Sequence, residues 1–325
     1  MPKVFITRLI PDRGINLLKN KGYEVVISEK DGVLTKEELL NSLKGENYDA
    51  VLCLLTDKID ADVFAAAGPQ CKIFANYAVG FDNIDLKTIQ SRGVMITNTP
   101  DVLTETVAEH TFALMISMAH RIVEADKFMR AGKYAGWAPM LLLGDDIARK
   151  TLGVVGLGRI GSRVAYHAVK GFDMKVLYYD PKRNDQFEKD YGATYTPNLD
   201  DLLKQADFVS IHVPLLPATH HLINAEKLSL MKRTAYLINT SRGPIVDEAA
   251  LAIALKQRII KGAAIDVFEN EPQMHPMLKD LDNIIVTPHI ASATEETRQK
   301  MSELAAKNII EALEGRTPPN LVKVV

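Results

Sequence analysis

The sequence predicts an α/β fold in which two domains each contain a doubly wound parallel sheet. Short apolar runs of strand length alternate with helix-length segments along the whole chain, the pattern of parallel sheets covered by helices. The length of 325 residues is enough for two such domains. Hydrophobic residues make up 47% and charged residues 25% of the chain, and the formal net charge is −2. This balance is typical of a globular protein and gives no reason to expect a nucleic acid or an anionic membrane as partner.

The first hundred residues contain five of these strand-length runs. We expect a helix beginning at Pro11, because proline suits the first turn of a helix, and another at the capping box Thr35–Glu38. Cys53 and Cys71 lie in two of the apolar runs and are expected to be buried small residues rather than a disulfide or metal pair. The expected strands are residues 4–6, 23–27, 50–54, 72–75 and 94–96.

A turn at residues 98–101 leads into a stretch without a strand pattern. One long helix is expected over residues 104–129, followed by a loop over 131–144 that contains Gly, Pro and Trp137, the only tryptophan in the sequence. A lone Trp in such a loop needs an apolar partner, which a subunit interface or local packing can supply.

The middle of the chain combines a short apolar strand, residues 152–155, with three glycines at GxGxxG spacing. Gly156 would make the tight turn, Gly158 would let the backbone approach a pyrophosphate, and Gly161 would let the following helix pack on the strand. That helix is expected to begin at about Arg159 and to offer its N-terminal N–H groups to phosphates. This order of elements predicts a Rossmann-like unit that binds a dinucleotide.

An acid follows the next expected strand, residues 175–179. Asp180 stands 19 residues past Gly161, where a carboxylate accepts hydrogen bonds from ribose hydroxyls and repels a 2′-phosphate. Lys182 and Arg183 follow and can offset that repulsion. We therefore expect NAD(H) to be preferred and NADP(H) to be possible.

The remaining strands are followed by one more long helix, expected to begin at a second capping box, Ser292–Glu295. Because this helix comes after the last strand of the dinucleotide domain, it can return to the first domain. We expect a discontinuous substrate domain and a cleft between the domains that holds a small ligand. The predicted domains are 1–100 plus 290–325 for substrate and 101–289 for the dinucleotide, and the remaining strands are 207–211, 235–238, 263–265 and 283–286.

Polar residues follow the last three of these strands, and ligands of open α/β sheets bind at the carboxyl ends of strands. Arg242 offers a guanidinium fork that matches a carboxylate. His289 can give or take a proton near neutral pH. Glu271, if it meets that imidazole, would fix its tautomer and favour its charged form. Asp266 can accept a hydrogen bond from a nicotinamide amide. Each of these residues taken alone is equally well explained by an ordinary surface or turn position.

The sequence resembles the D-isomer-specific 2-hydroxyacid dehydrogenases over nearly its whole length. The matching motifs are residues 156–161, Asn239–Pro244 with Val246–Glu248, Ala264–Phe268 with Glu271–Pro272, and Thr287–Ala291. The resemblance implies that Arg242, Glu271 and His289 are catalytic and that Asp266 binds the nicotinamide carboxamide. It also implies the discontinuous two-domain fold. The cofactor-binding residues that follow from it are Gly156, Gly158, Arg159, Ile160, Gly161, Asp180, Pro181, Lys182, His212, Val213, Pro214, Thr240, Ser241 and Asp266.

Within this family the chain is most similar to the glyoxylate/hydroxypyruvate reductases, on the stretches Leu55–Ile59, Val79–Asp85, Gly136–Pro139 and Leu143–Asp145. Successive N–H groups at Val79 and Gly80 can form an anion nest for a substrate carboxylate. The resemblance implies a homodimer in which Trp137 reaches the active site of the partner subunit. The substrate-binding residues expected are Leu55, Val79, Gly80, Trp137, Arg242, His289 and Ser292.

Other readings remain open on the same scaffold. A D-lactate-like or phosphite dehydrogenase would differ only in small changes of the site loops, and a non-enzymatic dinucleotide-sensing protein would need partner-binding features that the sequence does not show. No histidine spacing predicts a metal site, and His220, His221 and His275 are expected to face solvent. The short apolar run at the N-terminus does not make a signal peptide, so a cytoplasmic location is expected.

Overall fold

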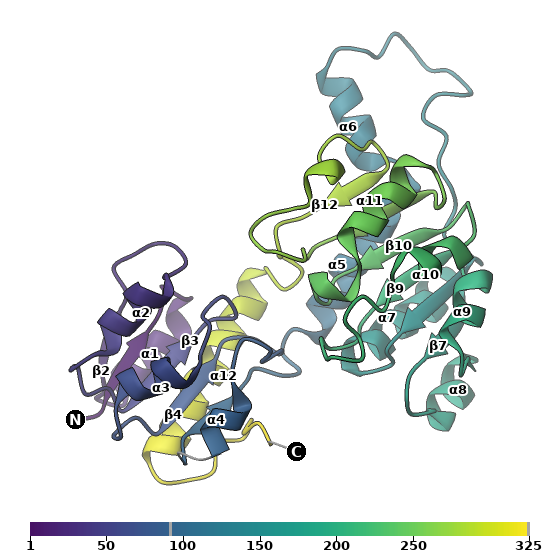
Figure 1. The fold of residues 1–325 in the computed structure, drawn as a ribbon. Helices are drawn as coiled ribbons and strands as arrows, with labels where there is room; N and C mark the ends of the chain where they lie inside the picture. The colour runs from purple at the N-terminus through teal and green to yellow at the C-terminus, as the bar shows by residue number, and fades with distance from the viewer. Residues whose placement is uncertain (91–92, 324–325) are drawn as a thin grey trace. The chain divides into compact units, whose positions relative to one another are not determined.

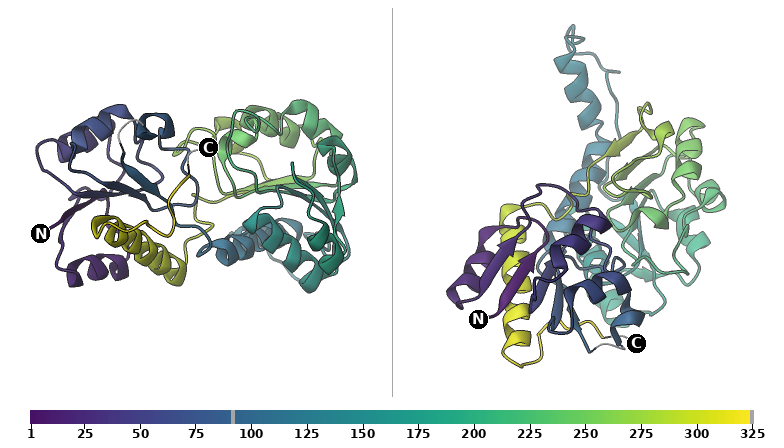
Figure 2. Two further views of the ribbon diagram at one scale, coloured as in Figure 1. Left: turned by 90° about the horizontal axis from the view of Figure 1, so that it is seen from below. Right: turned by 60° about the vertical axis from the view of Figure 1, so that its left-hand side comes forward.

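The computed structural model describes residues 1–90 and 93–323 and divides into two compact units (Figure 1). Unit 1 comprises Met1–Leu103 and Ala293–Val325, and unit 2 comprises Thr104–Ser292. Each unit contains a parallel sheet with helices on both faces, as Figure 2 shows. The doubly wound α/β class and the discontinuous first unit predicted from the sequence are thereby confirmed.

Unit 1, over its described residues, contains a five-stranded sheet in the order β2-β1-β3-β4-β5. The capping box forms as expected: Thr35 Oγ1 accepts from the Glu38 N–H at 3.2 Å, and Glu38 Oε2 accepts from the Thr35 N–H at 2.7 Å. Both cysteines are buried, and burial raises the pKa of the Cys71 thiol to about 12. The elements are β1 (Lys3–Ile6), α1 (Asp12–Asn20), β2 (Glu24–Ile27), α2 (Lys36–Leu43), β3 (Ala50–Cys53), α3 (Ala61–Ala67), β4 (Ile73–Asn76), α4 (Leu86–Gln90), β5 (Met95–Thr97) and α12 (Glu295–Leu313).

The C-terminal helix α12 belongs to unit 1, where it packs beside α1. The Gly14 N–H donates to Ser302 Oγ at 2.8 Å, and the Tyr77 hydroxyl donates to the Arg298 carbonyl at 2.6 Å. The predicted second capping box is wrong, because the cap is Thr294, whose side chain accepts from the Thr297 N–H. Ile290 and Ala291, which precede this cap, donate their N–H groups to the Asp266 carboxylate.

Unit 2, all of which the structure describes, contains a seven-stranded sheet in the order β12-β11-β10-β9-β6-β7-β8. Strand β8 is too short for the sequence pattern to have indicated it. The elements are α5 (Thr104–Ala119), α6 (Ile122–Arg130), β6 (Thr151–Val155), α7 (Arg159–Phe172), β7 (Lys175–Tyr179), α8 (Asp185–Tyr191), β8 (Thr194–Tyr195), α9 (Leu199–Gln205), β9 (Phe208–Ile211), α10 (Ala225–Leu230), β10 (Tyr236–Asn239), η1 (Gly243–Ile245), α11 (Glu248–Lys256), β11 (Gly262–Ile265), η2 (Pro276–Leu278) and β12 (Ile284–Val286).

The central strand β6 is buried on both faces of this sheet. Leu152 and Val154 contribute to the core shared with α5 and α7, whereas Val155 contributes to the core shared with α9. This alternation follows from the two-residue period of a strand. The strand therefore holds the glycine loop that follows it on a rigid support.

The single long helix expected over residues 104–129 is wrong, because the structure has two helices there. Helix α5 ends at Ala119, and Arg121 adopts a left-handed conformation with φ of 56°. The chain returns at Gly144 and Asp145, and the Asp145 N–H donates to the Ala119 carbonyl at 2.9 Å. The returning loop thus satisfies the last carbonyl of α5 at the point where the helix stops.

Helix α6 and the loop after it extend away from the rest of unit 2 (Figure 1). None of the residues of α6, all of them described, is buried. Among the described residues, no helix is long and apolar enough to cross a membrane.

Candidate active site

The residues singled out in unit 2 lie after the carboxyl ends of its parallel strands. Asp180 follows β7, Arg242 follows β10, Asp266 follows β11 and His289 follows β12. Because these strands are parallel, these positions share one edge of the sheet with the glycine loop after β6. The fold thus brings the expected cofactor and catalytic residues to the same edge.

The glycine loop has the geometry that its spacing predicts. Gly156 has φ of +96°, and a Cβ there would lie 2.8 Å from Val213 Cγ1. A Cβ on Gly161 would overlap the Gly156 carbonyl oxygen, so glycine is required for α7 to pack this close to the strand. A Cβ on Gly158 would meet no described heavy atom within 4 Å. The loop is therefore open on the side from which a pyrophosphate would approach, and α7 begins at Arg159 as expected.

Asp180 is fixed beside this loop by two backbone groups. Its Oδ2 accepts from the Leu157 N–H and its Oδ1 from the Lys182 N–H, both at 2.9 Å. Arg183, expected to offset the charge of Asp180, is held by acidic groups of α8: its guanidinium lies 2.8 Å from Glu188 Oε2 and 3.0 Å from Asp185 Oδ1.

Glu271 and His289 meet, which is the contact on which the role expected of Glu271 depends. His289 Nδ1 lies 2.9 Å from Glu271 Oε2, and their side chains are 25% and 30% exposed. Glu271 Oε1 accepts from the Phe268 N–H at 3.1 Å, which orients the carboxylate. His289 itself has a left-handed backbone with φ of 54°, fixed by hydrogen bonds from its N–H to the carbonyls of Asp266 and Thr287. Since Nδ1 faces Glu271, Nε2 is the nitrogen left to face a substrate.

Arg242 sits on a loop shaped by Asn239, a residue that the sequence analysis did not select. The Asn239 side chain is buried, donates to the Arg242 carbonyl and accepts from the Ser241 N–H, each at 3.0 Å. A Cβ on Gly243 would overlap the Phe268 carbonyl, so this loop packs directly on the segment that leads to Glu271. A polar amide at the end of a buried apolar strand was the available signal for Asn239.

Asp266 is fully buried and its carboxylate is bound by protein groups. Its Oδ1 accepts from the Thr287 hydroxyl at 2.6 Å and from the Ile290 N–H at 2.9 Å, and its Oδ2 accepts from the Ala291 N–H at 2.8 Å. Burial raises the pKa of Asp266, but hydrogen bonds from His110, Thr287 and the two backbone groups outweigh it and hold the pKa below its usual range. Asp266 therefore organises the segment that carries His289, and its expected contact with a nicotinamide stays a prediction.

His212, next to the cofactor loop, is unsuited to be an acid. Its Nε2 lies 2.7 Å from Ser210 Oγ, and desolvation lowers its pKa to about 3. The ring is therefore neutral at physiological pH. Ser241 Oγ donates to the Val213 carbonyl, which joins the turn after β9 to the loop after β10. Thr240 is buried, and its hydroxyl oxygen lies 3.0 Å from the hydroxyl oxygen of Thr111.

The substrate-binding residues expected in unit 1 follow β3 and β4. Asn98 Nδ2 donates to the Val79 carbonyl at 2.8 Å, and Asn76 Nδ2 donates to the Gly80 carbonyl at 2.9 Å. These two amides, which the sequence analysis did not select, hold the loop in shape. The roles of Leu55, Val79, Gly80 and Ser292 in binding a substrate stay predictions.

The loop after α6 places Trp137 at the surface, with 82% of the residue exposed. Other large apolar residues of the same segment are also exposed, including Met129, Met140 and Leu143. We refer to α6 and residues 131–144 together as the arm.

The expectation that three loop histidines only face solvent is wrong in part. His221 Nε2 lies 2.7 Å from Glu269 Oε1, and His275 Nδ1 accepts from the Met277 N–H at 3.3 Å at the start of η2. His220 is exposed as expected, but its ring lies against that of His221. The contact of His221 with Glu269 joins residues far apart in sequence, which spacing alone does not reveal.

Comparison with known proteins agrees with this geometry. The family model of the D-isomer specific 2-hydroxyacid dehydrogenase NAD binding domain matches residues 112–291. The glyoxylate reductase of Korarchaeum cryptofilum is 50% identical over 324 residues, which cover 99% of this chain and 96% of that protein.

Two solved structures have the same fold over nearly the whole chain. The NADPH-dependent glyoxylate/hydroxypyruvate reductase of Sinorhizobium meliloti, in complex with NADP and malonate, has a TM-score of 0.85 at 30% identity and covers 99% of this chain and 96% of its own. The D-lactate dehydrogenase of Aquifex aeolicus, complexed with NAD and lactic acid, has a TM-score of 0.85 at 32% identity and covers 98% of each chain. With this similarity, the glycine loop and the paired His289 and Glu271, the chain belongs to the D-isomer specific 2-hydroxyacid dehydrogenases.

Proposed function

We propose that this enzyme reduces a small 2-oxo acid, glyoxylate or hydroxypyruvate, to the 2-hydroxy acid with NADH or NADPH. The observation that carries the proposal is the 2.9 Å contact between His289 Nδ1 and Glu271 Oε2 at the sheet edge that also holds the glycine loop. The names of the Korarchaeum and Sinorhizobium relatives support the choice of substrate.

A bound nicotinamide dinucleotide supplies the hydride that adds to the carbonyl carbon of the substrate. His289 gives a proton from Nε2 to the carbonyl oxygen as the negative charge develops there, which completes the hydroxyl group. Glu271 holds the imidazole by Nδ1 and stabilises its charged form before transfer. Arg242 binds the substrate carboxylate and polarises the carbonyl through its guanidinium group.

We propose that NAD(H) is preferred over NADP(H). Asp180 is fixed at the end of β7 by the N–H groups of Leu157 and Lys182, and its charge favours ribose hydroxyls over a 2′-phosphate. Arg183 is engaged by Glu188 and Asp185 rather than turned to Asp180. Related structures of the same fold contain NADP or NAD, so we expect Asp180 rather than the fold to set the preference between NAD(H) and NADP(H).

The arm supports a second part of the proposal, a homodimer formed through it. Trp137, Met129 and Met140 are more than half exposed, which is unusual for apolar residues gathered on one segment and typical of an interface. We propose that Trp137 enters the substrate site of the partner subunit and limits the space beside the substrate. The site of action is proposed to be the cytoplasm.

A substrate panel followed by NADH and NADPH absorbance tests the proposal. Glyoxylate or hydroxypyruvate with NADH should give the highest kcat/KM. Faster turnover of pyruvate would favour a D-lactate-like enzyme, and oxidation of phosphite would favour a phosphite dehydrogenase. Dinucleotide binding without turnover of any of these acids would favour a sensing protein, and a higher kcat/KM with NADPH would refute the role given to Asp180.

A further inference from the structure

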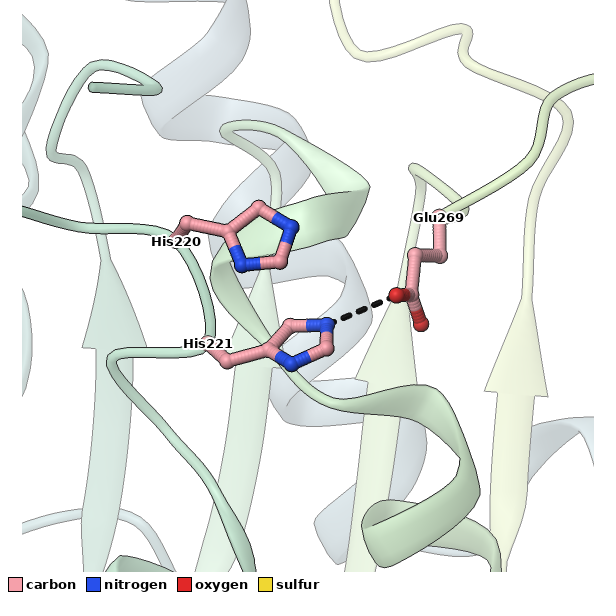
Figure 3. A group of neighbouring side chains, drawn as sticks. All are labelled: His220, His221 and Glu269. Atoms are coloured by element: carbon pink, nitrogen blue, oxygen red, sulfur yellow. Dashed lines mark hydrogen bonds and ion pairs between the residues drawn. The ribbon is translucent and has the colours of Figure 1, made fainter. Parts of the chain in front are cut away.

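A cluster of three metal-ligating side chains lies outside the catalytic residues, on two loops of unit 2. His220 and His221 follow β9, and Glu269 follows β11. One ligand atom from each lies within 4.8 Å of the others, and Figure 3 shows the two imidazoles side by side facing the carboxylate. We propose that these three residues bind a divalent transition-metal ion, with Zn²⁺ the ion that their chemistry fits best.

Two imidazoles and one carboxylate are a ligand set that Zn²⁺ takes in proteins, with water in the fourth position. Imidazole and carboxylate groups also suit Co²⁺ and Ni²⁺, whereas Ca²⁺ and Mg²⁺ prefer oxygen ligands alone. The three ligand atoms lie within 4.8 Å of one another, and His221 Nε2 and Glu269 Oε1 are in direct contact at 2.7 Å, so side-chain rotations would have to open this pair and turn all three atoms toward the ion.

The backbone places these side chains before any ion binds. His221 has a left-handed conformation with φ of 49°, and its N–H donates to the Pro244 carbonyl at 2.8 Å. This conformation costs energy for a residue other than glycine. The rings of His220 and His221 lie beside each other in this turn, with centroids 4.1 Å apart and planes inclined by 31°.

Glu269 is oriented by contacts with His221 and Glu248. Its Oε1 lies 2.7 Å from His221 Nε2, while its Oε2 accepts from the Glu248 N–H at 3.3 Å and its own N–H donates to Glu248 Oε1 at 2.6 Å. Partners of this kind orient the ligands of metal sites.

An ordinary ion pair would need only His221 and Glu269. That ion pair gives no role to the ring of His220, which lies beside that of His221. A metal ion would use both imidazoles together with the carboxylate as its ligands.

The place of the cluster gives the ion a structural consequence. Pro244, which binds His221, is two residues from Arg242, and Glu269 is two residues from Glu271. A metal ion here would tie the loop after β9 to the segments that carry both of these residues. We therefore expect it to stiffen those segments without contacting the substrate.

Metal binding is tested on the full chain, freed of any affinity tag and treated with chelator. Zn²⁺ is titrated by calorimetry, and Co²⁺ is titrated by its visible absorption, which strengthens in a tetrahedral nitrogen and oxygen site. The expected result is one ion bound per chain, with the Co²⁺ spectrum lost on addition of Zn²⁺.

The deciding variant is His220→Ala, because His220 is exposed and its removal leaves the pair of His221 and Glu269 in place. Loss of a direct ligand should weaken Zn²⁺ binding at least as much as loss of an outer partner does, roughly 10–100-fold. Glu269→Gln should weaken it similarly, and His120→Ala, which removes another exposed histidine, should not change it. Equal affinity in wild type and His220→Ala, or no binding to the wild type, would overturn the proposal.

Discussion

His289 Nδ1 lies 2.9 Å from Glu271 Oε2 although the two residues lie on separate loops. Each residue also makes a hydrogen bond to a backbone group, which orients it. The Phe268 N–H holds the far oxygen of Glu271, and the carbonyl of Asp266 holds the N–H of His289. The pair is therefore oriented by the protein before a substrate arrives. Preorganisation of this kind lets a proton donor act without rearrangement during the reaction.

Replacing His289 by alanine should abolish most turnover, because the change removes the group that we propose gives the proton. We expect kcat to fall by roughly 10²–10⁴-fold, the usual contribution of general acid catalysis, with the Kd for NADH changed less than about threefold. Glu271→Gln should reduce kcat less, since the amide still contacts the ring but no longer stabilises its charge. Steady-state kinetics and NADH fluorescence titration measure both, and His120→Ala serves as the control. A His289→Ala enzyme with kcat near that of wild type would rule out the assigned role.

Two glycines of the nucleotide loop should respond differently to the same substitution. Gly161→Ala places a methyl group against the Gly156 carbonyl, so the variant should be destabilised by about 1–3 kcal/mol. Gly158→Ala meets no described atom, so its stability should be near that of wild type while its affinity for NADH falls by about tenfold or more. Urea unfolding and NADH titration separate the two effects. Unchanged NADH affinity in Gly158→Ala would show that the pyrophosphate does not approach there.

Asp266 should make stability depend on pH in a defined direction. Because its pKa in the folded protein lies below its usual value, the carboxylate stabilises the fold above the unfolded pKa of about 4. That contribution is lost as the pH falls through the lower folded pKa.

Asp266→Asn should therefore lower the free energy of unfolding at pH 7 by roughly 1.5–3 kcal/mol, the worth of hydrogen bonds to a charged group. The difference from wild type should shrink below about pH 4, as denaturant unfolding at several pH values will measure. Asp126→Asn, at an exposed ion pair of α6, is the matched control. A difference that stays constant down to pH 2 would mean that the charge of Asp266 is not what stabilises the loop.

Trp137→Ala should weaken the proposed dimer and change the substrate profile. Truncating a Trp that is buried at an interface often costs about 2 kcal/mol or more of binding free energy. The variant dimer should therefore have a higher dissociation constant than the wild-type dimer in sedimentation experiments. The ratio of kcat/KM for hydroxypyruvate to that for glyoxylate should rise, because the side chain no longer limits the space.

Lys133→Ala, another exposed position of the arm, should leave both properties unchanged. A wild-type protein that is a monomer at micromolar concentration would contradict the dimer, and an unchanged substrate ratio in Trp137→Ala would confine that residue to packing.

Much of unit 2 was predictable because its signals are local. The strand over residues 175–179 has the predicted limits, and the turn at Gly156 and the close packing at Gly161 follow from the spacing of glycines within residues 156–161. The alternation of strands and helices likewise specifies the class of fold, since each run reports its own burial. The family resemblance added Arg242, Glu271 and His289 as expected catalytic residues. The structure brings Glu271 and His289 into contact, and the catalytic roles stay predictions.

What the sequence left undecided depends on contacts between distant residues. Helix α5 ends at Ala119, whose carbonyl accepts from the Asp145 N–H of the returning loop, and no pattern within 104–129 contains that partner. His221 meets Glu269 across 48 positions, and Asp266 accepts hydrogen bonds from Ile290 and Ala291, which follow the next strand. Periodicity and capping residues describe a segment's own preferences, whereas these partners are chosen only when the sheet brings its strand ends together.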